Sequence, residues 1–312
     1  MIDWATTAWL FPGQGSQQVG MGADLAARYP AAARIYEQAD RILGFEFSKM
    51  CFEGPAAALD ETINTQPALY VTGIATLAAL EEMHGQISPM AAAGHSLGEF
   101  TALTAVGALP FDAGLKLVRE RGRLMKEAGE KSPGAMAALL GASIEDVRAL
   151  CDQASAEVGR PVVLANDNCP GQVVISGDEQ ALDRALALAK ERGIKKTVKL
   201  AVSVAAHSPL MAHSAEAFRT ALAMTPFETP IVPIVGNVSA APLRTRNDIL
   251  SELDAQLTSS VRWTESIQAL RAMGVRTFVE LGPKEVLTGL LKRIDREATG
   301  IALNSAEAIA VL

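Results

Sequence analysis

The sequence predicts a two-part α/β protein, in which a small ferredoxin-like domain of the order βαββαβ is inserted into a larger domain with a mainly parallel sheet. Strand and helix patterns alternate in the first and last thirds of the 312-residue chain, and the middle third carries the inserted order. Alanine is abundant and aromatic residues make up only 5%, which favours small-residue helices packed closely on a sheet. We place the large domain at residues 1–129 and 201–312 and the small domain at 130–200.

The first third of the chain begins with a short buried strand and continues mainly as helices. The strand "AWLF" runs into a glycine-rich turn, and helical periodicity follows over residues 22–43 and 66–85. A strand of small residues, "SPMAAAG", then leads into Ser96. The helix that leaves this serine is followed by another over residues 110–130.

The middle third carries the elements of the small domain, and the last third returns to alternation. The expected strands and helices of the small domain lie, in order, at residues 134–141, 143–155, 162–167, 172–177, 178–193 and 195–202. Beyond residue 200, strands are expected at 230–238 and 276–282, with helices between them. The two outer thirds together therefore make the α/β domain.

Composition and charge exclude several classes of protein. A net charge of −7 argues against nucleic-acid binding, and no apolar run is long enough to span a bilayer. The four histidines form no HExxH-like pair, so we expect no metal site. Separately, we expect no cofactor. The odd, widely spaced cysteines are typical of reduced thiols, and Asp3 stands where a signal peptide would be basic. We therefore expect a cytoplasmic protein.

Ser96 has the sequence context of a nucleophile. In "AAAGHSLGEF" it lies between Gly94 and Gly98, after a strand and before a helix, as the G-x-S-x-G elbow requires. Small residues on both sides allow a sharp turn that lifts Oγ clear of the sheet and aims the helix N-terminus at a developing oxyanion. The backbone N–H of Leu97 would be one donor. The pattern is short enough to occur by chance, so the assignment of Ser96 as a nucleophile also requires a general base from elsewhere in the chain.

His207 is the best candidate for that base. It follows an expected strand in "VSVAAHSPLM", where its side chain can project into a cleft. His95 adjoins the serine, but adjacent side chains diverge at such a turn, so we interpret it as structural or as a neighbour of the site. His213 is typical of a solvated helix face and His84 of a helix C-terminus. No acidic residue stands out as a third member, and nothing specific marks Asp254.

The glycine-rich loop "FPGQGSQQVGMG" does not fit a nucleotide site. Gln18 occupies the position of the third glycine, and no Walker lysine follows. Such a loop can instead bring a backbone N–H, here that of Gln14, close to a reacting carbonyl.

Taken together, the motifs of the chain resemble those of the malonyl-CoA:acyl carrier protein transacylases over nearly its whole length. The motifs that carry the resemblance are "FPGQGSQ" at 11–17, "TQPAL" at 65–69, "GHSLGE" at 94–99, "RG" at 121–122, "NDNCPGQVVISG" at 166–177, "AAHSPLM" at 205–211 and "LGPKEVLTGLLKR" at 281–293. Their order and spacing are more specific than any one of them. The resemblance also implies an α/β-hydrolase-like large domain with a ferredoxin-like insert.

The resemblance implies a role for individual residues. Ser96 would be acylated and His207 would be its general base, oriented by the main-chain carbonyl of Gln256 rather than by an acid. The N–H groups of Gln14 and Leu97 would form the oxyanion hole.

Three further residues would contact the substrate. Arg121 would bind the free carboxylate of the malonyl group, since its guanidinium matches a carboxylate in two parallel hydrogen bonds. Without the resemblance, Arg121 would be one of several cations on a solvated helix. Gln66 and Asn168 match polar positions that line the family's site, although capping or turn roles fit each equally well. Small side chains at Ala205 and Ala206 favour a wide pocket, which leaves the exclusion of methylmalonyl groups open.

The implied reaction is a ping-pong transfer of malonyl from malonyl-CoA to acyl carrier protein, supplying fatty acid synthesis. An acidic carrier would dock on a basic patch, at residues 116–131 with six cations against three anions, or at 190–199 with five against one. Two alternatives remain open at this point: an acyltransferase that serves a polyketide pathway in trans, and a serine hydrolase or thioesterase. The serine motif by itself is compatible with all of these activities.

Overall fold

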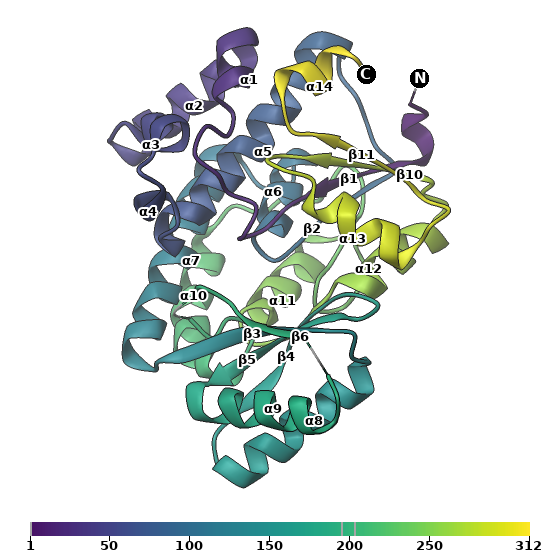
Figure 1. Ribbon diagram of the computed structural model, residues 1–312. Helices are drawn as coiled ribbons and strands as arrows, with labels where there is room; N and C mark the ends of the chain where they lie inside the picture. Colours follow the sequence, from purple (N-terminus) through teal and green to yellow (C-terminus); the bar gives the residue numbers. More distant parts are fainter. Residues whose placement is uncertain (1, 195, 203) are drawn as a thin grey trace.

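Two β-sheets organise the chain in the computed structural model, which describes residues 2–194, 196–202 and 204–312 (Figure 1). The six-stranded sheet is parallel except for its last strand pair, and the five-stranded sheet is antiparallel except for one pair. This mixed α/β architecture with a parallel sheet confirms the coarser part of the fold prediction. Lys195, in the predicted strand at 195–202, lies outside the described residues.

The strands come from distant parts of the chain. In spatial order the first sheet contains β11 (Thr299–Leu303), β10 (Thr277–Leu281), β1 (Thr7–Phe11), β2 (Ala91–Gly94), β7 (Ile234–Val235) and β8 (Pro242–Leu243). The second sheet contains β6 (Lys196–Lys199), β3 (Gly134–Leu140), β5 (Gln172–Asp178), β4 (Val162–Cys169) and β9 (Val261–Arg262).

Helices fill most of the remaining chain. The α-helices are α1 (Ala23–Arg28), α2 (Pro30–Leu43), α3 (Phe47–Glu53), α4 (Ala56–Leu59), α5 (Thr62–His84), α6 (Leu97–Ala105), α7 (Phe111–Lys131), α8 (Ile144–Val158), α9 (Glu179–Glu191), α10 (Ala212–Met224), α11 (Arg246–Gln256), α12 (Trp263–Ala272), α13 (Val286–Ile294) and α14 (Ala306–Ala310). Short 3-10 segments occur at Trp4–Thr6 and Pro209–Met211. Among the described residues, no helix has both the length and the apolarity needed to cross a bilayer.

The central strand β1 is buried on both faces. Trp9 and Phe11 point into the core formed with α5 and α6, whereas Ala8 and Leu10 point into the core formed with α12 and α13. Because successive side chains of a strand alternate between faces, a strand covered by helices on both sides must be apolar throughout. This burial explains the uninterrupted run "AWLF".

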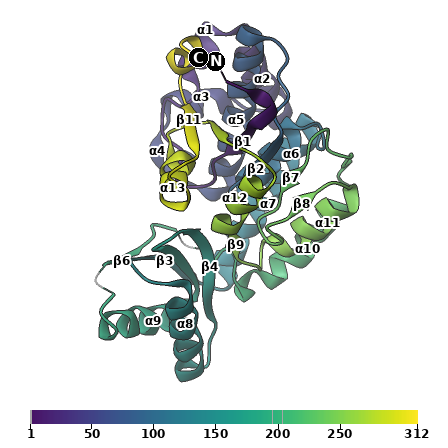
Figure 2. The same ribbon diagram turned by 90° about the vertical axis from the view of Figure 1, so that its right-hand side faces the viewer.

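The smaller sheet has a core of its own. Helices α8 and α9 cover one of its faces and lie at the far end of the molecule from the chain termini (Figure 2). Strand β9 joins this sheet from outside residues 130–200, pairing Val261 with Asn166 of β4 in parallel. The small sheet is thereby hydrogen-bonded to the segment that leads into α12.

Several predicted elements differ in extent from those of the structure, and proline contributes to the two clearest differences. The helix expected over 22–43 is broken at Tyr29, which has extended backbone because the residue before a proline disfavours the helical region. The strand expected over 230–238 is reduced to Ile234–Val235. Pro230 and Pro233 lack the N–H that a strand ladder requires.

The turn between β2 and α6 is held by close backbone packing. A Cβ atom added to Gly98 would lie 1.9 Å from the carbonyl oxygen of Phe11, and one added to Gly94 would lie 2.0 Å from the backbone of Gly98. Phe11 and Gly94 are also register partners of adjacent parallel strands. The loop after β1 and the turn after β2 therefore meet at one edge of the sheet.

We predict that Gly98→Ala destabilises the protein by at least about 2 kcal/mol, because its methyl group must displace the backbone of β1. The matched control is Gly289→Ala in α13, where an added Cβ meets nothing within 4 Å. There the change should be neutral or stabilise by about 0.5–1 kcal/mol through helix propensity. Urea unfolding of both variants gives the comparison, and equal stabilities would contradict the packing argument.

Candidate active site

Ser96 occupies a strained turn at the carboxyl edge of the first sheet. Its φ of 51° lies in a region that residues other than glycine rarely adopt. Its backbone N–H donates to Asn237 Oδ1 at 2.6 Å, and Asn237 Nδ2 donates to the carbonyl of Gly94 at 2.7 Å. The side chain of Asn237, which is fully buried, therefore bridges the two sides of the turn and stabilises its strained conformation.

His207 lies in hydrogen-bond contact with the serine. Its Nε2 is 2.9 Å from Ser96 Oγ, and its Nδ1 is 2.8 Å from the carbonyl oxygen of Gln256 and 3.1 Å from that of Ser259. Carbonyl oxygens only accept, so Nδ1 carries the proton and Nε2 presents its lone pair to the serine hydroxyl. This tautomer can remove a proton from Ser96.

Burial keeps the imidazole of His207 neutral. Desolvation, together with the nearby guanidinium of Arg121, lowers the pKa of His207 from 6.5 to about 3. The hydrogen bonds to the Gln256 and Ser259 carbonyls act in the opposite direction but are outweighed. His207 is thus in its basic form over the whole physiological pH range.

Arg121 is not on a solvated helix face. Only 1% of its surface is exposed, and it donates from Nη1 to Gln66 Oε1 at 2.9 Å and from Nη2 to Gln256 Oε1 at 2.9 Å. Nη2 also lies 3.1 Å from Ser96 Oγ. Burial lowers the pKa of Arg121 to about 10, so the guanidinium stays charged beside the serine.

A cavity of about 170 Å³ adjoins these side chains. Gln14 and Leu97 line it together with Ser96, His207 and Arg121. The rest of its lining is Met125, Met136, Asn166, Asn168, Val174, Leu200, Val202, Val204, Ala206 and His95. The cavity lies where both sheets contribute residues, because β3, β4 and β5 supply part of this wall.

The two remaining predicted substrate residues lie in different places. Asn168 lines the cavity, and its Oδ1 is 2.8 Å from His95 Nε2. Gln66 is buried behind Arg121 and donates to Met125 Sδ at 2.9 Å. The contact with Asn168 also places His95 beside the site rather than on the serine hydroxyl.

The other titratable candidates lie away from the serine. His213 is exposed on α10, and His84 at the end of α5 contacts the carbonyl of Ile309. Asp254 pairs with Arg219 at the surface, 2.7 Å apart. Within the described ranges no group of three His, Cys, Asp or Glu side chains is arranged to hold a metal ion.

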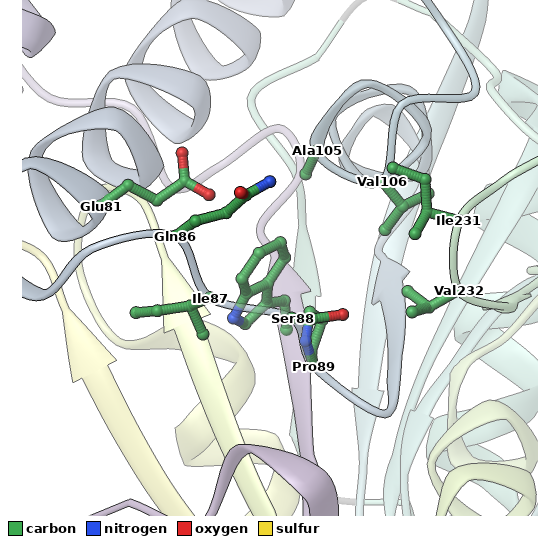
Figure 3. A pocket seen from close by; sticks show the side chains of 10 residues that line it. Glu81, Gln86, Ile87, Ser88, Pro89, Ala105, Val106, Ile231 and Val232 are labelled. Carbon is green, nitrogen blue, oxygen red and sulfur yellow. The ribbon is translucent and has the colours of Figure 1, made fainter.

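A larger cavity of about 370 Å³ lies at the opposite edge of the first sheet (Figure 3). Gln86, Ser88 and neighbouring residues line it just before β2, and Ile231 and Val232 line it just before β7. These are the amino ends of the strands, whereas Ser96 follows a carboxyl end. The polar side chains that line this larger cavity, among them Glu81, include no histidine or other base beside a nucleophile. The size of the cavity alone therefore does not mark it as the reaction site.

Comparisons with known proteins identify the family of the chain. The family model of the acyl transferase domain matches residues 8–308. A malonyl CoA-acyl carrier protein transacylase of Bacillus subtilis is 45% identical over 97% of this chain and 94% of its own length. The chain belongs to the malonyl-CoA:acyl carrier protein transacylase family.

Solved structures of the family share its fold. The malonyl-CoA:acyl carrier protein transacylase of Xanthomonas oryzae has a TM-score of 0.94 at 42% identity, covering 98% of this chain and 97% of that one. A second structure, a type II PKS acyl-carrier protein in complex with its malonyl-transacylase, also has a TM-score of 0.94, at 37% identity over 98% of both chains. The chain is therefore an acyltransferase.

Sequence reasoning missed Asn237 in this acyltransferase. The signal available was a polar residue just beyond a short apolar strand, separated from it by Gly236 in "PIVGNVSA", at the edge of a parallel sheet where functional side chains gather. Its partner Gly94 lies 143 residues away in sequence, so only the folded chain shows the contact.

We predict that acylation keeps its rate in moderately acidic solution. Because the pKa of His207 is lowered to about 3, kcat/KM for acylation should stay flat from about pH 8 to about pH 5 and fall only below that range. Single-turnover acylation measured across this range, with circular dichroism at each pH to verify folding, gives the profile. An acid limb centred near 6.5 would show that His207 titrates normally.

We also predict that Asn237→Ala weakens both the turn and the reaction. The partly buried N–H of Ser96 and the buried carbonyl of Gly94 lose their partner, which should cost about 1–3 kcal/mol in stability. The acylation rate should fall at least about tenfold, because the strained serine is no longer fixed. Asn304→Ala, which removes an exposed amide bonded to the Lys284 carbonyl, is the control. Equal rates in the two variants would contradict this role.

Proposed function

We propose that the chain transfers a malonyl group from malonyl-CoA to the phosphopantetheine thiol of an acyl carrier protein, through a malonyl ester on Ser96. One observation carries the proposal: Ser96 Oγ lies 2.9 Å from a neutral base and 3.1 Å from the buried guanidinium of Arg121. The first contact supplies a nucleophile. The second supplies a cation that can pair with the free carboxylate of a malonyl group, which an acetyl group lacks.

In the acylation half-reaction, Ser96 Oγ attacks the thioester carbonyl carbon while its proton passes to His207 Nε2. The tetrahedral oxyanion accepts hydrogen bonds from the backbone N–H groups of Gln14 and Leu97, which line the cavity. Collapse breaks the C–S bond, and the departing sulfur takes the proton from His207. The main-chain carbonyl of Gln256 accepts from Nδ1 throughout and stabilises the transient imidazolium.

The transfer half-reaction runs these steps in reverse. The carrier's thiol gives its proton to His207 and attacks the ester carbon, and Ser96 leaves with the proton returned by Nε2. The order is ping-pong, since free CoA departs before the carrier binds. A carboxylate orienting His207 is not needed, because two carbonyl oxygens already fix its tautomer.

Arg121 supports a malonyl rather than an acetyl substrate. Its guanidinium is held by two amide oxygens and the serine, so the substrate carboxylate supplies the opposite charge that these neutral partners do not. An acyl group without a carboxylate leaves this buried cation without an opposite charge, so the site disfavours such a group. The same feature separates the proposal from a serine hydrolase or thioesterase, whose simple esters need no buried cation.

The carrier protein is proposed to dock on residues 190–199. On α7, by contrast, Arg121 is buried in the site, Arg123 pairs with Glu120 and Glu127, and Lys126 pairs with Glu61. The stretch 116–131 therefore presents less free positive charge than its composition indicates. Lys190, Arg192 and Lys196 are exposed, while Lys199 contacts Asp183.

The pathway is proposed to be fatty acid synthesis, with a polyketide pathway served in trans as the second candidate. The relative solved with a type II PKS carrier protein favours keeping that second candidate. The chemistry at Ser96 is the same in both, so the carrier alone distinguishes them.

We further propose the finer classification of the fold. Strands β3 to β6 with α8 and α9 follow the order βαββαβ and lie in the spatial order β6-β3-β5-β4, which supports a ferredoxin-like domain at 130–200. The serine turn between a central parallel strand and a helix supports an α/β-hydrolase-like domain formed by 1–129 and 201–312.

We predict that mixing the protein with malonyl-CoA produces a malonyl adduct visible by intact-protein mass spectrometry. Ser96→Ala should abolish the adduct, and acetyl-CoA should acylate the wild-type chain at least about a hundredfold more slowly, because it leaves Arg121 unpaired. An adduct that persists in Ser96→Ala would overturn the assignment of the nucleophile. Steady release of CoA without an adduct would favour the hydrolase.

A further inference from the structure

Arg121 has an unusual environment for a buried cation. Its three hydrogen bonds go to neutral oxygens, those of Gln66, Gln256 and Ser96, and its Nε has no partner among the described residues. A guanidinium carries five N–H donors in a fixed fork, so small rotations change which of them face the cavity. The neighbours that set this orientation therefore affect how a carboxylate is received.

Gln256 is one of the neighbours that orient Arg121, and its side-chain amide is itself held by further hydrogen bonds. Its Oε1 accepts from Arg121, while its Nε2 donates to the carbonyl of Ser96 at 3.0 Å and to Glu99 Oε2 at 2.5 Å. The carbonyl oxygen of Ser96 can only accept, and Glu99 accepts here through Oε2, so both contacts require the NH₂ group of Gln256 on this side. Glu99 and the Ser96 carbonyl together hold the amide with its oxygen toward Arg121 and disfavour the flipped state, in which the NH₂ group of Gln256 would face the N–H donors of Arg121.

Glu99 is buried without a direct ionic partner. None of its surface is exposed, although it lies only three residues after Ser96 in the first turn of α6, where acidic residues usually remain solvated. Burial, with Glu252 nearby, raises the pKa of Glu99 well above its usual value. Its Oε2 accepts from Gln256 in either protonation state. A buried carboxyl is costly, and packing alone would be served by an apolar side chain.

We propose that Glu99 is a positioning residue for malonyl selection: through the side-chain amide of Gln256 it fixes the guanidinium of Arg121 to receive the substrate carboxylate. The inference rests on the proposed function, since it assumes that Arg121 pairs with the malonyl group. Gln256 then acts twice, with its main chain on His207 and its side chain on Arg121. One residue joins the base to the acyl-binding cation, and Glu99 sets the second of these contacts.

The test compares Glu99→Ala and Glu99→Gln by single-turnover acylation at varied malonyl-CoA and acetyl-CoA concentrations. We expect Glu99→Ala to raise the half-saturating concentration of malonyl-CoA about tenfold and to reduce the malonyl preference similarly, with less than threefold change in the maximal rate. Glu99→Gln retains an acceptor oxygen for Gln256 Nε2 and should stay within about threefold of wild type in both quantities.

Glu280→Gln is the matched control. Glu280 is also a fully buried carboxyl with a raised pKa, but it accepts from the backbone N–H groups of Leu287 and Thr288 at the start of α13. Its loss should lower the melting temperature while leaving the malonyl preference unchanged. An equal loss of preference in Glu280→Gln would show that general destabilisation explains the effect, and would overturn the proposal.

Gln256→Met supplies a second route if Glu99→Ala does not fold. It removes the amide but keeps the main-chain carbonyl for His207, so it should lose malonyl preference as Glu99→Ala does. In a folded double variant the losses of malonyl preference should not add, because both changes break the same connection from Glu99 through Gln256 to Arg121. Unchanged preference in Gln256→Met, or full additivity, would overturn the inference. The proposed function fails separately, if the wild-type chain forms no adduct on Ser96.

Discussion

The close backbone contact between β1 and the turn after β2 is the constraint on which the site depends. Gly98 lies against the carbonyl of Phe11, Gly94 lies against Gly98, and Ser96 between them has a positive φ. Any side chain at either glycine would separate the two strands' ends, and the serine would no longer face the loop that carries Gln14. The two proposed oxyanion donors come from these two ends, so the same contact that strains the backbone also brings the donors together.

The strain at Ser96 is balanced by polar groups that come from far along the chain. Asn237 bonds to both sides of the turn, and the loop that carries Asn237 is in turn held by Glu252, which accepts from the N–H groups of Val238 and Ser239. Gln256 adds a third bond, to the carbonyl of Ser96. The residues from 237 to 256 therefore stabilise a turn made by residues 94 to 98, and they carry the carbonyl that orients His207.

The electrostatics of the site follow from burial. A buried cation beside a buried imidazole makes protonation of the imidazole unfavourable, so the base stays neutral without a carboxylate to orient it. The guanidinium itself remains charged because its pKa falls only to about 10. Since both groups contact Ser96 Oγ, the nucleophile lies between a base and a cation in surroundings with little water to screen either one.

Local patterns in the sequence determined the class of the fold and several of its elements. Apolar runs gave the buried strands, helical periodicity gave most of the helices, and the glycines around Ser96 gave the turn, because each of these depends on neighbouring residues. The motifs, by their order, gave the family. The errors in the predicted elements are also local. Pro30 ends a helix and Pro233 shortens a strand, because the prediction gave more weight to periodicity than to proline.

Only the tertiary structure decided which polar side chains meet. Arg121 is buried by the folded chain, and His207 contacts two main-chain carbonyls. The bonds of Asn237 and Glu99 join segments up to 157 residues apart. No local pattern encodes such contacts. Composition and spacing did not distinguish Arg121 from the cations around it, and only the family resemblance marked it. No role was predicted for Glu99, which has the position of an ordinary acid at a helix start. The charge state of a side chain and the strength of its hydrogen bonds depend on its burial away from water, and burial is a property of the packed chain.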